Sequence, residues 1–553
     1  NIQEGFQAFL NSYLCFREKT IDKINKECYK QSPRDFARLL LAVFVCSFFK
    51  EIATMIKVFL FVMSLFFFSV NADAKDPWIG YAAGGYNGKI LVFELPSLNL
   101  LKEVPAGVDL RGPVLSGNKG GNSNGTPDGK MLYAVDKAAN TVVFFDLASS
   151  KVTKTVALPA GFGPGNLDIS PDNKSLCVAG ELSGKIAKVD TASGKVDVVA
   201  VSMKPAAPAF SAITRDGKTC LVSDYTNSVV WVVSMNPFKI EKSVAAGGEN
   251  PFGIATTPDG KWALISNQFS ANMAFLDIAT MKVTKSVKTA AVPIHAVVDS
   301  KGKFAYQSAF LGSVVKKIDL STQAVVDTFS VKSRPGNLGL SPDDKLLFVL
   351  NKYSTGQFEA VKAKVGPGAV NPTNIQVIDT ATGKTVSQKP VLGEPFSVAV
   401  AAAGVIKDAS LGAGKPAVAA GREIDLPAKK NVKVTYGPAK PHKPGVFDGA
   451  SGQEVYLNAF SHQFAPNEVN VYKGETVKII LQNIDEKGAM IDNADVVHGF
   501  TINGYADQTQ VLLPRGVSAT LEFSPDRSGT FDFYCSNFCG SVHTEMRGRF
   551  IVE

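Results

Sequence analysis

The sequence predicts an all-β protein, and three observations support this fold class. A turn of the form Ser/Thr-Pro-Asp-Gly-Lys, or a variant of it, recurs every 42 to 44 residues through the first two thirds of the chain. From Glu454 onward, short runs alternate apolar and polar residues, with turn sequences between them. A segment rich in Ala, Gly, Pro and Lys separates the two patterns. We therefore expect a seven-bladed β-propeller over 75–403, a linker over 404–452 and a Greek-key β-sandwich over 453–553.

The propeller prediction depends on the repeated unit. The second position of the recurring turn is occupied by Pro127, Pro171, Arg215, Pro258, Ser300 and Pro342. Each turn is followed by three expected strands. The first is apolar, the second ends near an acidic residue, and the third carries a sequence similar to Lys-Val. The acidic positions are Glu94, Asp146, Asp190, Asp277, Asp319 and Asp379, with Ser234 replacing the acid once. Six turns and a partial unit at 78–104 give seven blades, and we expect a strand at 395–401 to close the ring.

Two features stand out within the repeats. The last repeat carries an insertion at 353–372, which we interpret as a loop on one face. Cys177 and Cys220 occur in blade strands of successive repeats. We expect these two cysteines to be buried thiols that face opposite sides of their strands rather than a disulfide.

The segment 404–452 has the composition of a linker, with one plausible strand at 431–436. We expect it to pack along the rim of the propeller. His442, in Lys-Pro-His-Lys-Pro, is then a solvated linker residue. His462, in Ser-His-Gln-Phe, is interpreted as a polar residue at a strand end rather than a ligand.

The carboxy-terminal runs predict the strands of the sandwich. They span 454–460, 468–472, 476–482, 495–502, 518–523, 530–535 and 549–552. Turn sequences such as Lys-Gly-Glu, Asn-Gly and Pro-Asp separate them. In this arrangement His498 lies on a strand close to the loop that joins the last two strands, and a stiff sandwich positions such a loop.

The end of the chain gathers residues that bind soft metals. Cys535, Cys539, His543 and Met546 occur in one short segment, and His498 lies upstream in Val-Val-His-Gly-Phe. Thiolate, thioether and imidazole ligands select copper over hard cations. On a β-sandwich, a His/Cys/Met set of this kind is the usual setting for electron transfer by copper. We therefore predict a cupredoxin domain.

The second cysteine determines the number of copper ions. A mononuclear centre needs one thiolate, whereas two bridging thiolates hold two coppers, as in the binuclear CuA centre. Cys535 and Cys539 would bridge the pair, and His498 and His543 would each bind one copper. Met546 would be a weak ligand to one copper and the backbone carbonyl of Asn537 a ligand to the other. We thus expect two coppers per chain.

The cysteine motif has two other interpretations. In an oxidising compartment Cys535 and Cys539 could form a small disulfide loop. The presence of several ligand types at fitting spacings argues against that interpretation. A copper chaperone with Cys-x3-Cys and a distant histidine is the other alternative, but the βαβ pattern of a thioredoxin-like fold is absent.

The amino-terminal region predicts export. Met55 begins a short positive segment, an apolar run at 58–70 follows, and Ala72-Asp-Ala74 precedes Lys75. This is the pattern of a secretory signal peptide over 55–74, cleaved after Ala74, so we expect a periplasmic protein. Residues 1–54 are interpreted as upstream translated or disordered sequence. The alternative is a membrane anchor formed by the apolar segments at 39–70, which charged residues interrupt.

A seven-bladed propeller followed by a CuA cupredoxin resembles nitrous-oxide reductase, a periplasmic copper enzyme. The resemblance covers the chain after the signal peptide and is most specific in Tyr534-Cys-Ser-Asn-Phe-Cys-Gly-Ser-Val-His-Thr-Glu-Met and Val497-His-Gly-Phe-Thr-Ile. It implies a head-to-tail homodimer and, as electron donor, a c-type cytochrome or small blue-copper protein; the acceptor is unknown. The net charge of +8 falls to +6 without residues 1–74, and this mild excess is compatible with docking an acidic redox partner and does not indicate nucleic acid.

The histidine content departs from that family. Its propeller holds a tetranuclear copper–sulfide cluster bound by seven histidines, where nitrous oxide is reduced. In this chain the propeller region contains one histidine, His295, and 117–125, where the family has its dense histidine motif, contains none. We infer that the catalytic cluster is absent, and we interpret His295 as a satisfied polar residue in preference to a remnant of a ligand position.

These residues predict electron relay without an assigned catalytic residue. Three alternatives remain: a nitrous-oxide reductase-type oxidoreductase with a divergent active site, a protein like subunit II of cytochrome c oxidase, and a copper storage or delivery protein. The subunit II alternative predicts a membrane hairpin before the cupredoxin, and 404–452 contains none.

Overall fold

The computed structural model describes the propeller and the sandwich. The described residues are 78–83, 88–115, 129–332, 334–352, 372–392, 397–405, 433–440, 442–449, 452–460, 463–485, 497–509, 511–535 and 545–553. The predicted signal peptide, most of the insertion at 353–372 and His462 lie outside them. In the described part of the chain, no helix has the length and apolar character needed to cross a membrane.

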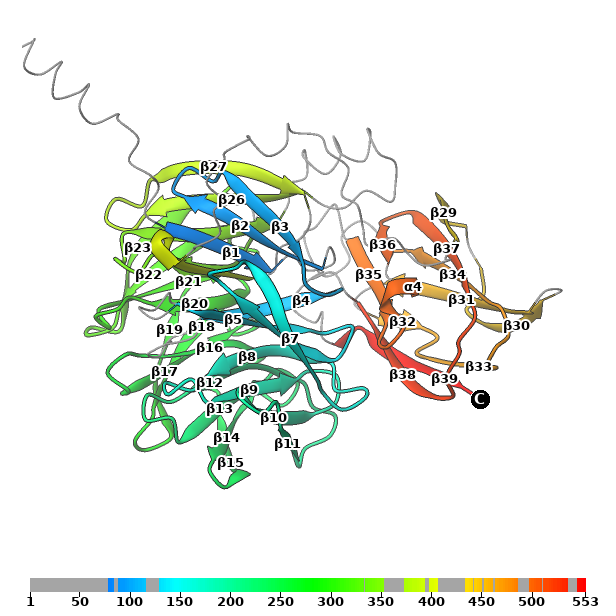
Figure 1. Cartoon of the computed structure of the whole chain (residues 1–553), viewed down its shortest axis with the longest axis horizontal. Coiled ribbons are helices and arrows are strands. Elements are labelled where there is room, and N and C mark those ends of the chain that lie inside the picture. Colours follow the sequence, from blue (N-terminus) through cyan, green and yellow to red (C-terminus); the bar gives the residue numbers. More distant parts are fainter. Residues whose placement is uncertain are drawn as a thin grey trace, which may run out of the picture. The chain divides into compact units, whose positions relative to one another are not determined.

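Seven four-stranded antiparallel sheets form the blades of a propeller, as predicted (Figure 1). Blade one contains β1 (Trp78–Ala83), β2 (Lys89–Leu95), β3 (Leu100–Pro105) and β28 (Ser397–Ala402). Blade two contains β4 (Leu110–Leu115), β5 (Met131–Asp136), β6 (Thr141–Asp146) and β7 (Lys151–Ala157). Blade three contains β8 (Pro164–Ile169), β9 (Ser175–Gly180), β10 (Lys185–Asp190) and β11 (Val196–Ala200). Blade four contains β12 (Pro208–Ile213), β13 (Thr219–Asp224), β14 (Val229–Met235) and β15 (Phe238–Ala245). Blade five contains β16 (Pro251–Thr256), β17 (Trp262–Asn267), β18 (Asn272–Asp277) and β19 (Lys282–Lys288). Blade six contains β20 (Pro293–Val298), β21 (Phe304–Ala309), β22 (Val314–Asp319) and β23 (Ala324–Ser330). Blade seven contains β24 (Arg334–Leu340), β25 (Leu346–Lys352), β26 (Pro372–Asp379) and β27 (Thr385–Leu392).

The ring closes by pairing the last propeller strand with the first. β28 is antiparallel to β1, with Trp78 opposite Ala402 and Ala83 opposite Ser397. The predicted closing strand is therefore confirmed. Closure of this kind removes the exposed edge that a linear row of sheets would leave. A 3₁₀ turn, η2 (Ala403–Val405), follows it.

The repeated turns are held by their own side chains. In four of them a hydroxyl donates to the aspartate two residues later, at 2.5 to 2.7 Å; the pairs are Ser170–Asp172, Thr214–Asp216, Thr257–Asp259 and Ser341–Asp343. The acids at the ends of third strands accept bonds from the following turn, and these bonds lower the pKa of Asp190, Asp277, Asp319 and Asp379. The repeating aspartates therefore have a structural role, which explains their period.

Buried polar side chains connect neighbouring innermost strands. The carboxylate of Asp168 on β8 accepts a 2.7 Å bond from the backbone N–H of Ile213 on β12. Asn337 on β24 donates to the hydroxyl of Ser397 on β28 at 2.6 Å. All four residues are buried. Bonds of this kind satisfy polar groups near the propeller axis and fix how successive blades approach one another.

The expectation that Cys177 and Cys220 remain thiols is wrong. They form a disulfide between β9 and β13, with their Cα atoms 6.6 Å apart. These strands belong to different sheets whose faces pack together in one hydrophobic cluster. The alternation of side chains applies within a sheet and does not prevent two residues on facing sheets from pointing at each other.

The carboxy-terminal domain is a sandwich of two sheets. One sheet has the order β29-β37-β34-β31-β30, with β32 added to β31, and the other has the order β33-β39-β38-β35-β36. The strands are β29 (Lys433–Pro438), β30 (Gly445–Gly449), β31 (Gly452–Phe460), β32 (Gln463–Ala465), β33 (Glu468–Val471), β34 (Val477–Asn483), β35 (Val497–Ile502), β36 (Val511–Pro514), β37 (Val517–Phe523), β38 (Gly529–Tyr534) and β39 (Arg547–Val552), with the short helix α4 (Ala506–Thr509). Every strand that the sequence predicted in this domain has a counterpart here.

Part of the predicted linker belongs to the sandwich. β29 pairs with β37 and β30 pairs with β31, so 433–449 contributes two strands to one sheet. His442, which we expected to be solvated, is partly buried, and its ring packs edge-to-face on Tyr456 with the centroids 4.8 Å apart. Single strands between Gly and Pro residues give a weak sequence pattern, so composition alone suggested a linker.

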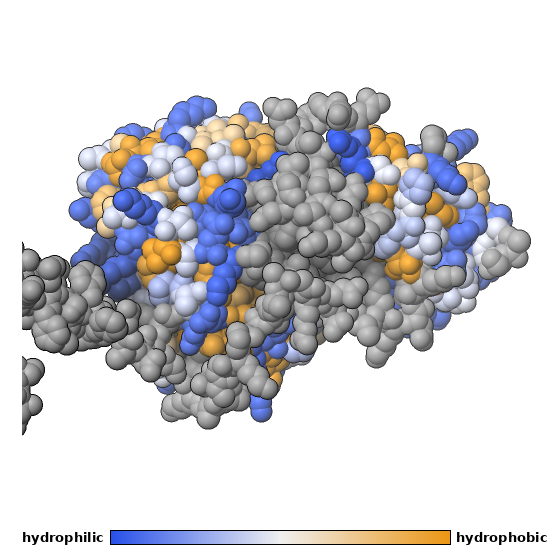
Figure 2. All heavy atoms as spheres, turned by 90° about the horizontal axis from the view of Figure 1, so that it is seen from above, coloured by the Kyte–Doolittle hydropathy of each residue, from blue (hydrophilic) through white to orange (hydrophobic). Residues whose placement is uncertain are grey.

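The described surface has no large apolar face. Hydrophilic and hydrophobic residues are interspersed on the face shown in Figure 2. The large exposed hydrophobic side chains come from separate elements: Val198, Met203, Phe269, Val326, Val386, Phe447, Tyr472 and Ile484. Scattered apolar residues of this kind are usual on protein surfaces.

We predict that the disulfide stabilises the propeller. Replacing Cys177 and Cys220 by Ala should lower the free energy of unfolding by about 2–4 kcal/mol, because the bond closes a loop whose ends are 43 residues apart. Urea unfolding measured with and without a reductant tests this. The wild-type midpoint should fall in reductant and the midpoint of the double variant should not. Equal midpoints for all four samples would contradict the prediction.

Candidate metal centre

Three of the six predicted ligands lie in the described part of the chain. His498, Cys535 and Met546 are buried in the core of the sandwich, with exposed fractions of 0%, 1% and 0%. Asn537, Cys539 and His543 fall in 536–544, outside the described residues. The structure therefore brings together one imidazole, one thiol and one thioether of the predicted set.

Strand pairing explains why these three residues meet. Cys535 directly follows β38 and Met546 directly precedes β39, and these two strands are antiparallel with Tyr534 opposite Arg547. The backbone N–H of Cys535 donates to the carbonyl of Met546 at 2.9 Å. β35, which carries His498, pairs with β38 through Thr501 and Tyr534. The hydrogen bond between Cys535 and Met546 thus joins the residues on either side of 536–544, next to the strand that carries His498.

The sulfur of Cys535 and the ring of His498 face each other. Cys535 Sγ lies 4.0 Å from Nδ1 of His498 and accepts a hydrogen bond from the backbone N–H of Gly499 at 3.3 Å. Bonds from sulfur and imidazole nitrogen to zinc, a metal ion of similar size to copper, are about 2.3 and about 2.0 Å. Two donor atoms 4.0 Å apart can therefore contact one ion. The donor types and this separation fit copper.

Asp485 orients the imidazole. Its Oδ2 lies 2.6 Å from Nε2 of His498, and both side chains are buried. Asp485 follows β34, and its backbone N–H donates to Asn483 Oδ1 at 3.1 Å, which anchors the carboxylate. A carboxylate on one ring nitrogen fixes the ring and leaves the other nitrogen for a metal. Nδ1 is therefore the nitrogen that faces Cys535.

The same neighbours determine the charge of His498 in the protein without metal. Burial by itself would lower the pKa of His498, but the hydrogen bond with Asp485 and the adjacent Cys535 raise it to about 9. An imidazolium is thus stabilised between a carboxylate and a sulfur. A metal ion bound at Nδ1 would take the place of a proton in this arrangement.

The propeller histidine is a satisfied structural residue. His295 on β20 is 1% exposed, and its Nδ1 accepts a hydrogen bond from the backbone N–H of Leu338 on β24 at 3.3 Å. The ring also packs on Phe210, with centroids 5.9 Å apart. Burial lowers its pKa to about 3, so the ring is neutral at pH 7. Residues 117–125 lie outside the described part of the chain.

Sequence reasoning did not identify Asp485. A signal was present, since Asn-Ile-Asp-Glu follows an apolar strand and polar residues at strand ends often support a site. Its partner is thirteen residues away across a segment of irregular sequence. Only the packing of the two sheets shows that the carboxylate reaches the ring.

Comparisons with known proteins agree with this arrangement. The family described as "Lactonase, 7-bladed beta-propeller" matches residues 83–300, and the family described as "Cupredoxin-like domain" matches residues 439–552. Fold and site together define a propeller–cupredoxin protein.

Two nitrous-oxide reductases are among the relatives. That of Cupriavidus necator is 26% identical over 337 residues, which cover 55% of this chain and 47% of the relative. That of Ralstonia nicotianae is 27% identical over 340 residues, with the same two shares. The chain spans about half the length of these relatives.

A third relative matches a smaller part of the chain. Cytochrome c oxidase subunit 2 of Thermus thermophilus is 30% identical over 115 residues, which cover 21% of this chain and 76% of the relative. The chain is similar to nitrous-oxide reductases, and its carboxy-terminal domain belongs to the family of cytochrome c oxidase subunit 2. The cupredoxin-like domain and these relatives imply copper and electron transfer.

We predict that Asp485 contributes to metal affinity. Asp485→Asn should weaken copper binding about 10- to 100-fold, because the carboxylate that orients His498 is lost. Competition titration with a copper chelator measures this. Asp526→Asn is the matched control, since Asp526 is exposed and contacts only its neighbour Arg527 among the described pairs. Equal affinities for the two variants would contradict the role of Asp485.

We predict that His295 affects stability and its pH dependence. Its pKa is lowered in the folded protein, so the unfolded chain binds an extra proton between pH 6.5 and about 3, and stability falls as the pH falls through this window. From pH 7.5 to 5 the wild type should lose about 2 kcal/mol more than His295→Gln. Urea unfolding at both pH values measures the difference. Parallel losses would show that His295 is charged in the fold.

Proposed function

We propose that this protein is an exported copper protein whose carboxy-terminal domain holds a binuclear CuA centre and relays single electrons. The observation that carries the proposal is the buried pair of Cys535 and His498, whose donor atoms face each other at 4.0 Å. A second cysteine and a second histidine follow in the same segment, at Cys539 and His543. The relatives and the cupredoxin-like domain support copper as the metal.

The proposed ligand set is divided between fixed strands and the segment that joins β38 to β39. His498, Cys535 and Met546 occupy strand ends, while Asn537, Cys539 and His543 would complete the set. Bound copper would supply a one-electron redox couple. The protein contributes a buried site, a thiolate stabilised by the N–H of Gly499 and an imidazole held by Asp485. Fixed ligands of this kind keep the reorganisation on electron transfer small.

We propose no catalytic copper cluster in the propeller. Seven imidazole ligands cannot come from one histidine, and His295 accepts a hydrogen bond from the backbone N–H of Leu338 in the neighbouring blade. The similarity to nitrous-oxide reductases favours one alternative, a reductase whose active site uses other ligands. Nitrous-oxide turnover by copper-loaded protein distinguishes the two functions, because a pure relay shows no turnover.

The partners and the compartment are part of the same proposal. The pattern at 55–74 supports export to the periplasm. A c-type cytochrome or a small blue-copper protein is the proposed electron donor, and a head-to-tail homodimer is the proposed assembly. The mild positive charge would favour an acidic donor, so electron entry should slow as salt is raised.

Copper stoichiometry with electron paramagnetic resonance tests the proposal. Copper-loaded, oxidised protein should hold two coppers per chain and show a seven-line hyperfine pattern. Cys539→Ser should reduce the content to one copper and give a four-line pattern, because a single thiolate cannot bridge a pair. The variant with both Cys177 and Cys220 replaced by Ala is the control, since it loses the propeller disulfide without freeing a thiol, and it should leave the pattern unchanged. A four-line pattern in the wild type would contradict a binuclear centre, and about six coppers would support the reductase alternative.

A further inference from the structure

The segments that carry the metal ligands also contact the propeller of the same chain. Tyr534 directly precedes Cys535, and its hydroxyl bonds to Asp109. Glu545 directly precedes Met546 and accepts a 2.8 Å bond from Thr226. Arg547, which follows Met546, donates to the carbonyls of Glu181 and Leu182 at 3.2 Å. Both ends of 536–544 are therefore attached to propeller residues.

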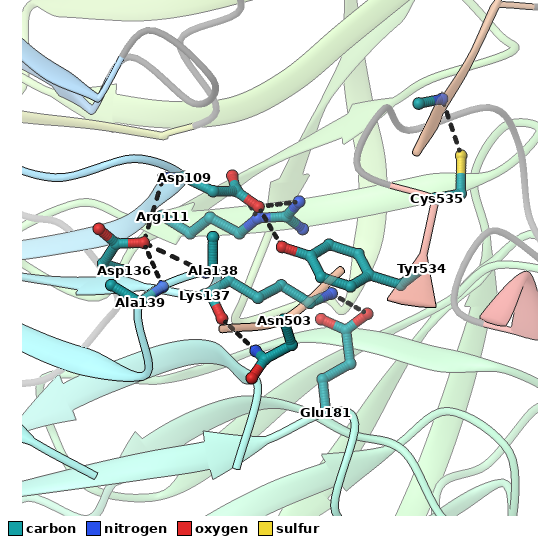
Figure 3. Close-up of polar contacts among 11 residues, drawn as sticks. Asp109, Arg111, Asp136, Lys137, Ala138, Ala139, Glu181, Asn503, Tyr534 and Cys535 are labelled. Atoms are coloured by element: carbon teal, nitrogen blue, oxygen red, sulfur yellow. Dashed lines mark hydrogen bonds and ion pairs between the residues drawn. The ribbon is translucent and has the colours of Figure 1, made fainter. Parts of the chain in front are cut away.

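Tyr534 lies on a buried group of charges that we call the platform, formed by Asp109, Arg111, Lys137 and Glu181 (Figure 3). The hydroxyl of Tyr534 donates to Asp109 Oδ2 at 3.0 Å. The ammonium of Lys137 lies 4.6 Å from the centre of the Tyr534 ring. Tyr534 is 2% exposed, so both contacts are shielded from water.

The platform consists of two ion pairs with defined geometry. Arg111 holds Asp109 through two bonds, from Nε to Oδ1 at 3.1 Å and from Nη2 to Oδ2 at 3.0 Å. Lys137 pairs with Glu181 at 3.0 Å. All four side chains are nearly inaccessible, and burial lowers the pKa of Lys137 to about 8. Buried ion pairs contribute little net stability, so a role in specifying one arrangement accounts for them better.

The backbone beneath the platform is also fixed. The carboxylate of Asp136 accepts hydrogen bonds from four backbone N–H groups, those of Val108, Asp109, Ala138 and Ala139, at 2.7 to 3.1 Å. Asn503, which follows β35, donates to the carbonyl of Lys137 at 2.9 Å. The turn between β5 and β6 thus connects the platform to the strand that bears His498.

We propose that the platform is an intramolecular docking site that positions Cys535, with Tyr534 as the positioning residue. Tyr534 is adjacent to Cys535 in the chain, and the hydrogen bond from Cys535 N–H to the Met546 carbonyl closes the base of 536–544. Fixing the Tyr534 side chain on Asp109 therefore restricts the backbone that presents the thiol. The effect of this restraint on bound copper rests on the proposed function. The restraint of the Cys535 backbone by Tyr534 does not depend on that function.

The first test measures backbone protection in the full chain without copper. Tyr534→Phe keeps the ring and removes the hydroxyl, and Asp109→Asn removes the charge that accepts from it. Hydrogen exchange at the Cys535 N–H should accelerate about tenfold in each, as expected for loss of one bond to a charged group. The double variant should exchange no faster than Asp109→Asn alone, because Tyr534→Phe removes only the bond to Asp109, whereas Asp109→Asn also weakens the ion pair with Arg111. Thr226→Val removes the more exposed bond to Glu545, on the other side of 536–544, and should leave this exchange rate unchanged.

The second test uses copper as the probe. The hyperfine splitting of copper-loaded Tyr534→Phe should differ from that of the wild type with copper content unchanged, while Thr226→Val matches the wild type. Unchanged exchange and splitting in Tyr534→Phe would overturn the inference, and so would equal effects from Thr226→Val. Exchange rates that rise on dilution of the wild type would assign these contacts to a second copy and also overturn it. Faster exchange in a chain that binds no copper would support the platform while contradicting the proposed function.

Discussion

The antiparallel pairing of β38 with β39 is the constraint on which the candidate metal centre depends. It places Cys535 and Met546 at the same end of the sheet and closes 536–544 with a backbone hydrogen bond. The pairing of β35 with β38 then brings His498 to the sulfur. A one-residue shift in either register would turn these side chains to the opposite face. The core around them includes Phe500 and Phe533, so the register that buries the aromatic rings also forms the site.

Polar groups, in addition to apolar packing, determine how the propeller is assembled. Asp168, His295 and Asn337 each bond to the next innermost strand, and each is buried. The platform uses the same principle where the propeller meets the metal-binding domain. An unpartnered buried charge is costly, so each such contact selects one arrangement of its neighbours over others. Through the proposed platform, the propeller would in this way restrain the backbone at Cys535.

Features with a period or a local motif were predictable. The repeated turns predicted seven blades because the motif is local: four of these turns are stabilised by a hydroxyl and an aspartate two positions apart, which the sequence displays directly. The closing strand followed from counting strands in the ring. The prediction for Cys177 and Cys220 was wrong because it considered faces within one sheet, whereas the bond joins two sheets. The strand expected at 431–436 corresponds to β29, but the linker prediction missed β30 and the membership of both strands in the sandwich, since their pairing partners β37 and β31 decide it.

The sequence by itself determined the all-β class and the number of blades, and it supplied the donor types of the proposed metal site, because these depend on residue chemistry and on short-range patterns. The tertiary structure decided which side chains support the donors. Asp485 reaches His498 only when the two sheets pack, and Tyr534 meets Asp109 across 425 positions of the chain. Contacts over such separations leave no local pattern, since each partner is an ordinary polar residue in its own segment. Their energies arise from burial and geometry, which exist only in the folded chain.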